Sequence, residues 1–443
     1  MVRFLKLADF RKVQIDKRSA MRWVMLSVLF LPFVFAFFIE LIGLPKAITV
    51  SIDILLVGAA VIVAFNALLN RRLLVSKITS FLSVLVVVFF LYTFVVYLFN
   101  FQSVFYYIWG FRNNFRFFAA FFLFIAFFRL DDVEDSLKAF DIIFWIHFAV
   151  TVFQFFVLKY RQDFLGGIFG VQKGCNGYVF FFLAIITVKS LLSLMNGKEK
   201  LYICFIKLAA IFLNAALAEL KAFFFIFIIV LAIASIITSF SIKKVFLIGG
   251  AALLISISYT ILVALFDNFR NFLSIEFLID SLLMTNYASN EDMGRFTSVA
   301  YICEHFLTSI PDRLFGMGLG NCDTSTMGIF NTDFYNTYAA THYSIFSISF
   351  MFIENGFIGL LIYLAFFAIC FIYSFVWFKK NKGNRFFNQM GLILSILCFA
   401  FAFYNSSLRT EAGYMVYFIL ALPFIGVAND SDNEYMTAYA DNI

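Results

Sequence analysis

The chain has little charge for its length. Only 14% of its 443 residues are Asp, Glu, Lys or Arg, whereas 63% are hydrophobic, and the mean hydropathy is +0.94. A soluble domain cannot bury that much apolar surface, so the composition excludes a soluble globular protein and indicates a polytopic membrane protein. Proline is also scarce, with four in the whole chain, which leaves the apolar runs largely free to form uninterrupted helices.

The usual metal and cofactor motifs are missing as well. The six cysteines include no CxxC pair and have no metal-ligand spacing with the three histidines, and no HExxH, Walker or GxSxG motif occurs. We therefore expect neither a metal nor a cofactor. The basic residues are scattered over short segments rather than gathered in one patch, which argues against a nucleic-acid partner. Cys303 and Cys322 fall in one loop, where either a disulfide or two free thiols would fit an oxidising compartment.

Apolar runs recur at about the 20 residues that a bilayer requires. They predict an all-α polytopic protein that forms one membrane domain over residues 1–443, with about twelve transmembrane helices. The fourth run is short and could begin earlier, and residues 344–354 could form a separate interfacial helix. The twelve runs are 23–42, 48–69, 78–98, 115–128, 140–158, 178–195, 201–218, 222–240, 245–266, 356–378, 388–405 and 413–428.

The distribution of Lys and Arg predicts the orientation. With the N-terminus inside, roughly twice as many basic residues fall in inner as in outer segments, as the positive-inside rule requires. Residues 1–22 then form a basic amphipathic stretch on the inner leaflet, and no cleavage site follows them. The polar tail, residues 429–443, is also cytoplasmic and expected to be disordered. One large loop, residues 267–343 between the ninth and tenth spans, lies outside.

The large outer loop carries the first candidate site residues. His342 stands where the loop returns to the membrane and could accept a proton from a hydroxyl, or could simply be an interfacial histidine. Arg295 and Arg313 are cations in an acidic loop. They could grip a phosphate group in bidentate fashion, or form solvated pairs with nearby carboxylates.

Further ionisable residues stand at the outer edge of the expected spans. Arg112 and Arg116 precede or begin the fourth span and could contact a ligand or snorkel to the interface. Glu219 and Lys221 occupy the short turn between spans seven and eight. Charges at this depth are costly and tend to be functional, although a Glu–Lys pair could also satisfy itself.

Together these features resemble the O-antigen polymerase and O-antigen ligase superfamily of bacterial surface-polysaccharide assembly. The topology matches, and the residue match is specific only over 294–361. Two positions depart from the family pattern: Tyr343 stands where Asn often follows the loop histidine, and Lys221 stands where an arginine is usual. The strongest matches are Gly294, Arg295, Pro311, Gly316 to Asn321, His342, Glu354, Asn355, Gly356, Gly359 and Leu360, and the weaker ones are Gly110, Arg112, Asn113, Gly170, Asn176 and Lys221.

The resemblance implies a metal-independent, inverting glycosyltransferase in the bacterial inner membrane, with its active loop in the periplasm. The donor would be a glycan on undecaprenyl diphosphate, and the partners a chain-length regulator and a flippase. Arg295 would stabilise the charge of the leaving diphosphate, and His342 would be the base. Substrate contacts would come from Arg112, Arg116, Lys221, Arg313 and Glu354.

We expect a repeat-unit polymerase, because the loop has few basic residues to meet a phosphorylated lipid A core. The alternative within the family is the ligase, which transfers the chain to that core. A lipid-linked oligosaccharide flippase or transporter would instead need charges in the middle of several spans and two repeated halves. A scaffolding membrane protein would tolerate loss of Arg295 and His342.

Overall fold

A computed structural model describes residues 2–69, 78–172, 174–265, 293–325, 328 and 330–440. Within these ranges the side chains of residues 2–19, 40, 66–69, 243 and 430–440 are not described. The first part of the expected large loop, residues 267–292, lies outside the described residues, as do the expected inner segment 70–77 and Lys173.

The described chain consists of helices and connections and contains no strand. Three short helices, α11 (Ser298–His305), α12 (Ile310–Phe315) and α13 (Asp333–Tyr338), belong to the large loop. The long helices are α1 (Val2–Ile42), α2 (Val50–Leu69), α3 (Ser80–Phe99), α4 (Val104–Phe127), α5 (Leu130–Phe156), α6 (Asn176–Met195), α7 (Leu201–Leu217), α8 (Lys221–Ile237), α9 (Ile242–Leu265), α14 (Ser347–Lys379), α15 (Arg385–Tyr404) and α16 (Gly413–Ala440).

The all-α membrane class is therefore supported. Among the described helices, eight are long and apolar enough to cross a membrane, namely α1, α2, α3, α5, α6, α9, α14 and α15. Three further apolar helices are shorter than these eight, namely α7, α8 and residues 413–429 of α16. Each expected span coincides with a helix, but the full number of twelve crossings stays a prediction.

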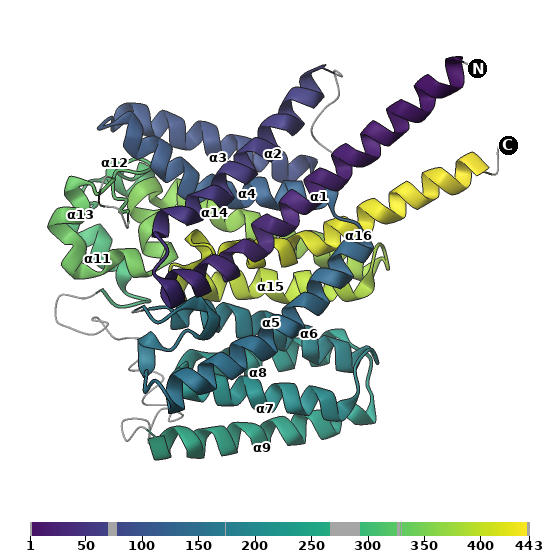
Figure 1. Ribbon diagram of the computed structural model, residues 1–443. Coiled ribbons are helices and arrows are strands. Elements are labelled where there is room, and N and C mark those ends of the chain that lie inside the picture. The colour runs from purple at the N-terminus through teal and green to yellow at the C-terminus, as the bar shows by residue number, and fades with distance from the viewer. Residues whose placement is uncertain are drawn as a thin grey trace.

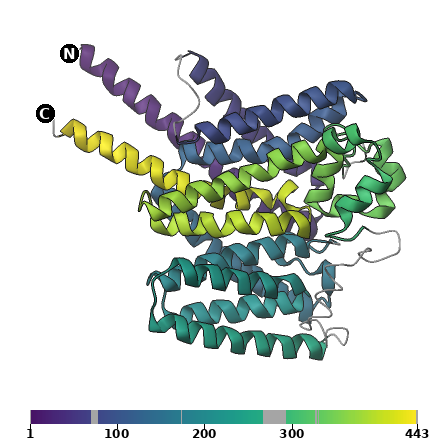
Figure 2. The same cartoon turned by 180° about the vertical axis from the view of Figure 1, so that it is seen from behind.

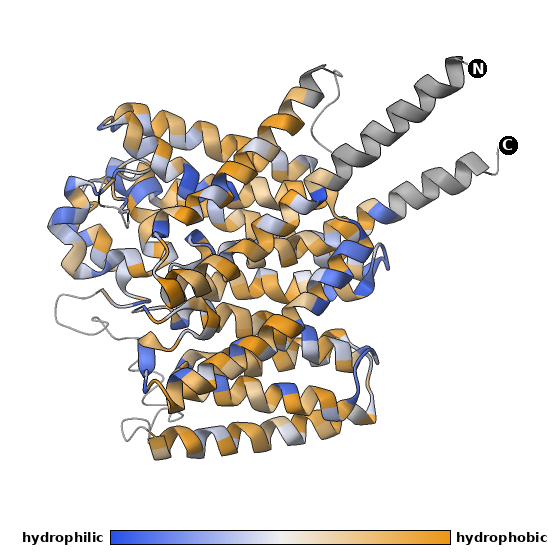
Figure 3. Cartoon of the chain, in the orientation of Figure 1, coloured by the Kyte–Doolittle hydropathy of each residue, from blue (hydrophilic) through white to orange (hydrophobic). Residues whose placement is uncertain are grey.

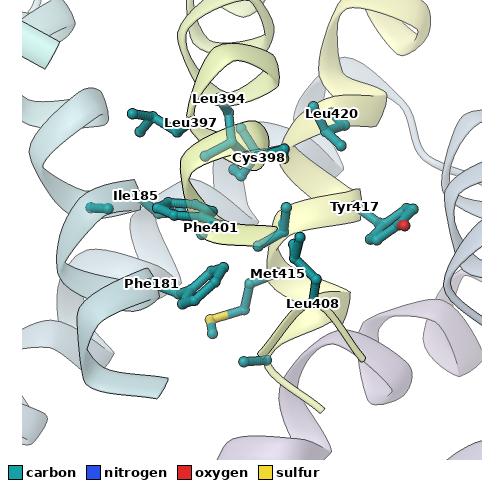
Figure 4. Packing of buried hydrophobic residues seen from close by; sticks show 14 of the residues in the cluster. Phe181, Ile185, Leu394, Leu397, Cys398, Phe401, Leu408, Met415, Tyr417 and Leu420 are labelled. Carbon is teal, nitrogen blue, oxygen red and sulfur yellow. The ribbon is translucent and has the colours of Figure 1, made fainter. Parts of the chain in front are cut away.

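The helices run roughly alongside one another (Figures 1 and 2). Helices α14, α15 and α16 pack together in the middle, α1 to α4 lie on one side of them, and α5 to α9 lie on the other. Most residues of α6 and α15 are buried, because both helices pack against several others. At their contact the rings of Phe181 and Phe401 lie 4.0 Å apart (Figure 4).

The polar residues gather at the two ends of the bundle, and apolar residues follow the helices between them (Figure 3). The start of α1 and the end of α16 lie at one end. Helices α11 to α13 lie at the other, which we call the loop end (Figure 1). The prediction of a disordered C-terminal tail is wrong up to residue 440, because α16 continues to Ala440.

Helix α14 is broken where a glycine-rich loop closes onto it. Gly356 has φ 59° and ψ −169°, a conformation open essentially only to glycine. The amides of Met317 and Gly318 donate to the carbonyl oxygens of Ile353 (2.9 Å) and Glu354 (2.9 Å). Gly356 therefore divides α14 into two helices, and the first of them, which begins at Ser347, is buried and leads directly into the tenth expected span. A separate helix before that span was one of the expectations for residues 344–354, and whether it lies at a membrane interface stays a prediction.

Candidate functional site

A large cavity opens at the loop end of the bundle, with a volume of about 1620 Å³. Five of the connections that the sequence places on the outer side contribute to its wall, and so do the ends of the adjoining helices. The contributing connections are 43–49, 157–175, 218–220, the described part of the large loop, and 405–412. The cavity therefore forms where chain segments far apart in sequence converge.

The wall of this cavity carries more positive than negative side chains. Among the described residues, it has six cations, four carboxylates and one histidine. The cations are Lys46, Arg112, Arg116, Lys221, Arg295 and Arg409, the carboxylates are Asp163, Glu219, Asp323 and Glu411, and the histidine is His342. Five of the seven residues predicted for the site thus line one cavity, although they come from four separate segments.

Arg295 and His342 are brought together by one backbone contact. The amide of Met293 donates to the carbonyl oxygen of Thr341 over 3.1 Å, which places the start of the Gly294–Arg295 turn beside the residue before His342. The guanidinium of Arg295 lies over the ring of Tyr404, 4.8 Å from its centre. Tyr404 is the last residue of α15, so this contact packs the Arg295 turn of the loop against the end of that helix.

Lys221 begins α8 and lies near the carboxylate of Glu219, which attracts its charge, and near the guanidinium of Arg295, which repels it. Two cations held near each other, both half-buried, favour an anion between them. His342 is exposed on the cavity wall and has a left-handed backbone conformation, with φ 54° and ψ 28°. The three residues form the part of the wall that is best suited to a phosphate group and a nearby hydroxyl.

Arg112 and Arg116 form ion pairs with the buried carboxylate of Asp53. Asp53, near the start of α2, accepts from Arg112 Nε at 2.9 Å and from Arg116 Nη1 at 3.2 Å. Arg116 also pairs with Glu411 at 3.2 Å, and Tyr414 donates to Asp53 at 3.2 Å. These arginines therefore link α2, α4 and the start of α16 through ion pairs and hydrogen bonds, in a cluster that we call the cavity floor. They do not extend toward lipid.

Glu354 is completely buried and does not line the cavity. Its Oε1 accepts from the amide of Gly320 over 2.9 Å, and its Oε2 lies 3.6 Å from Arg409 Nη2. Arg409 also lies 3.5 Å from Asp323 and 3.4 Å above the ring of Phe350. Glu354 thus holds Arg409 and the glycine-rich loop in place instead of facing a ligand.

Arg313 also lies away from the cavity. Its guanidinium donates to the carbonyl oxygens of Leu307 and Cys303, both at 2.9 Å, and so closes the turn between α11 and α12. The six cysteines are free thiols, including Cys303 and the fully buried Cys322. Tyr343 is buried and donates its hydroxyl to the Cys322 carbonyl oxygen.

One side of the cavity is apolar. It is lined by Phe225, Ile226 and Ile229 of α8 and by Ala400 and Phe403 of α15. Ile229 is 42% exposed, so this wall reaches the lateral surface of the bundle. The cationic residues Lys221 and Arg295 stand at the polar end of the same wall. A ligand with an anionic head and a hydrocarbon tail could place its head beside Lys221 and Arg295 and its tail along the apolar wall.

Sequence analysis predicted neither Asp53 nor Arg409 as a site residue. Asp53 was detectable in principle, because a lone carboxylate within an apolar helix is costly and calls for a partner. The identity of that partner depends on how α2 and α4 pack, which no local pattern reveals. Within the described residues, no three His, Cys, Asp or Glu side chains lie close enough together to hold a metal ion.

In comparisons with known proteins, no family model, no curated protein and no solved structure matches the chain.

Proposed function

We propose that the protein is a glycosyltransferase that polymerises surface-polysaccharide repeat units carried on undecaprenyl diphosphate. The observation that carries the proposal is the cavity at the loop end, where Lys221 and Arg295 stand beside an apolar wall open to the side of the bundle. A polyprenyl diphosphate has the matching order of parts, because its anionic head adjoins a long hydrocarbon chain.

The size of the cavity supports two sugar-bearing substrates rather than one small ligand. Its volume of about 1620 Å³ exceeds the roughly 300–1,000 Å³ of ordinary small-ligand pockets. A donor glycan and the terminal sugar of an acceptor can then meet inside it. The preference for a polymerase over a ligase still rests on the small number of basic residues in the loop.

The chemistry assigned to these residues is an in-line displacement. A hydroxyl oxygen of the acceptor sugar attacks the anomeric carbon of the donor, and the bond from that carbon to the diphosphate oxygen breaks. His342 takes the hydroxyl proton, and Arg295 and Lys221 stabilise the charge of the departing diphosphate. Attack opposite the leaving group inverts the anomeric centre. Lys221 provides a point charge and not a bidentate fork.

The proposal is tested by the surface polysaccharide of a deletion strain complemented with variants of this chain. His342→Ala or Arg295→Ala should give core carrying a single repeat unit and no ladder. His305→Ala is the matched control, because His305 is an exposed loop histidine that packs on Tyr301 and does not line the cavity. Bare core with accumulated lipid-linked polymer would identify a ligase instead. A normal ladder in both variants would contradict the proposed site.

A further inference from the structure

Three residues of the cavity wall have a backbone conformation that side-chain-bearing residues rarely adopt. Gln162, Glu219 and His342 all have φ 54°. In the described chain only two other residues besides glycines have positive φ, Lys159 and Asn381, and neither lines the cavity. Such conformations cost free energy and concentrate at functional sites. His342 already has a role in the proposed reaction, whereas Glu219 and Gln162 have none.

Glu219 occupies a position at which glycine is the usual residue. Helix α7 ends with paired hydrogen bonds from the amide of Leu220 to the carbonyl of Ala215 (2.9 Å) and from the amide of Glu219 to the carbonyl of Ala216 (3.2 Å). These two bonds define a Schellman motif in which Glu219 takes the left-handed position, where glycine avoids the penalty of a Cβ. Stability alone would favour glycine here, so the carboxylate calls for another explanation.

The carboxylate itself is incompletely satisfied. Among the described residues, no side chain or backbone group donates a hydrogen bond to Glu219 Oε1, which is buried. The side-chain amide of Gln162 does donate a hydrogen bond to this carboxylate, and Lys221 and Asp163 lie near it. Asp163 already accepts a hydrogen bond from Asn176 over 2.9 Å. A buried acceptor without a donor is costly, and a ligand that brings a donor would remove that cost.

We propose that Glu219 binds the sugar attached to the diphosphate and sets the preference for that sugar. The inference rests on the function proposed above, in which Lys221 and Arg295 hold the diphosphate. The first sugar is the next group along the donor, and Glu219 is the nearest carboxylate in sequence to Lys221. An ionised carboxylate can only accept hydrogen bonds, so it selects ligands that present hydroxyl or amide hydrogens. A site built in this way discriminates against a ligand that lacks them.

Two lipids provide the test on purified full-length protein. One is undecaprenyl diphosphate, and the other is the lipid-linked repeat unit extracted from a strain that lacks this protein. In Glu219→Asn the new side chain tolerates the left-handed conformation but has no charge, and Glu219→Gly relieves the strain entirely. We expect both variants to bind the lipid-linked repeat unit on the order of tenfold more weakly and to bind undecaprenyl diphosphate as the wild type does.

Thermal unfolding separates this role from a structural one. Glu219→Gly should raise the midpoint while it lowers the preference for the sugar-bearing lipid. Lys159→Gly is the matched control, because Lys159 has φ 62° at the same end of the bundle but lies outside the cavity. It should leave the preference unchanged. Unchanged preference in both Glu219 variants would overturn this inference alone, whereas failure of the wild type to bind either lipid would overturn the proposed function as well.

Discussion

Gly316 and Gly356 meet backbone to backbone: a Cβ added to Gly316 would lie 2.5 Å from the Gly356 nitrogen. A Cβ added to Gly356 would lie 2.4 Å from the carbonyl of Leu314. The backbones of residues 316–320 and of residues 354–356 therefore pack directly against each other, and we call this contact the interlock. Both segments carry much of the resemblance to polysaccharide polymerases. This interlock fixes Glu354, and through it Arg409, at the edge of the cavity.

Replacing Gly356 with alanine should destabilise the protein strongly. The backbone conformation alone should cost about 1–3 kcal/mol for a residue with a Cβ, and the clash with Leu314 adds to that cost. Thermal unfolding in detergent or nanodiscs measures the effect. Gly249→Ala is the control, because Gly249 lies within α9 with open space around it. That variant should gain roughly 0.5–1 kcal/mol, and equal effects in the two variants would contradict the interlock.

Replacing Asp53 with asparagine should also lower stability. Asp53 is the shared partner of Arg112 and Arg116, and its loss leaves buried positive charge poorly compensated. Breaking one member of a buried ion pair costs about 3–5 kcal/mol. Asp135→Asn provides the comparison, because Asp135 forms an exposed pair with Lys138 that is worth about 0–1 kcal/mol. A midpoint for Asp53→Asn close to that of the control would show that the cavity floor does not depend on this cluster.

The preference for the sugar-bearing lipid should depend on pH through Glu219. Burial raises the pKa of this carboxyl above its ordinary value of 4.5, so it takes up a proton at a higher pH than a solvated glutamate. Protonation removes an acceptor, and the preference should therefore fall as the pH drops toward and through this raised pKa.

The folding stability should depend on pH in the opposite sense. Because the folded state binds the proton more readily than the unfolded state, the stabilisation from the neutral carboxyl is present at low pH and is lost as the pH rises through the raised pKa. Glu219→Gln should remove both effects, and an unchanged profile in that variant would assign them to another group.

The loop cysteines should react as separate thiols. Cys303 is half-buried and Cys322 is fully buried, and burial raises the pKa of both, which lowers the fraction of reactive thiolate. A maleimide should label Cys303 slowly in the native protein and label Cys322 only after unfolding, as mass spectrometry can measure. Cys303→Ser serves as the control for the slow phase. A peptide that contains Cys303 disulfide-bonded to Cys322 would contradict this result.

Hydropathy predicted where the helices lie because it is a local property. Each of the twelve apolar runs coincides with a helix, but several helices extend beyond their runs. Helix α4, for example, begins at Val104 rather than at residue 115. The polar residues of its first half, including Arg112 and Asn113, made that half look like a loop. Their side chains pair with groups elsewhere in the fold, Arg112 with Asp53 of α2 and Asn113 with Asp323 of the large loop. Pairing between distant helices is not readable from one sequence.

The candidate site was predictable in part for the same reason. Arg295, Lys221 and His342 stood out as ionisable residues in the large outer loop or at the outer edge of the expected spans, and they line one cavity. Glu354 and Arg313 stood out equally, yet one is buried beneath the glycine-rich loop and the other closes a turn. Residue type alone does not separate a cation that faces a ligand from one that satisfies backbone carbonyls. That distinction appears only when the loop is folded onto the bundle.

The most direct test of the central claim is turnover by the purified protein, reconstituted with the lipid-linked repeat unit from its own strain as the only substrate. We predict that one undecaprenyl diphosphate is released for each glycosidic bond formed, and that polymer length increases with time. His342→Ala should abolish both signals, and His305→Ala should leave both intact. Release of undecaprenyl diphosphate without polymer, or polymer formation in His342→Ala, would contradict the account.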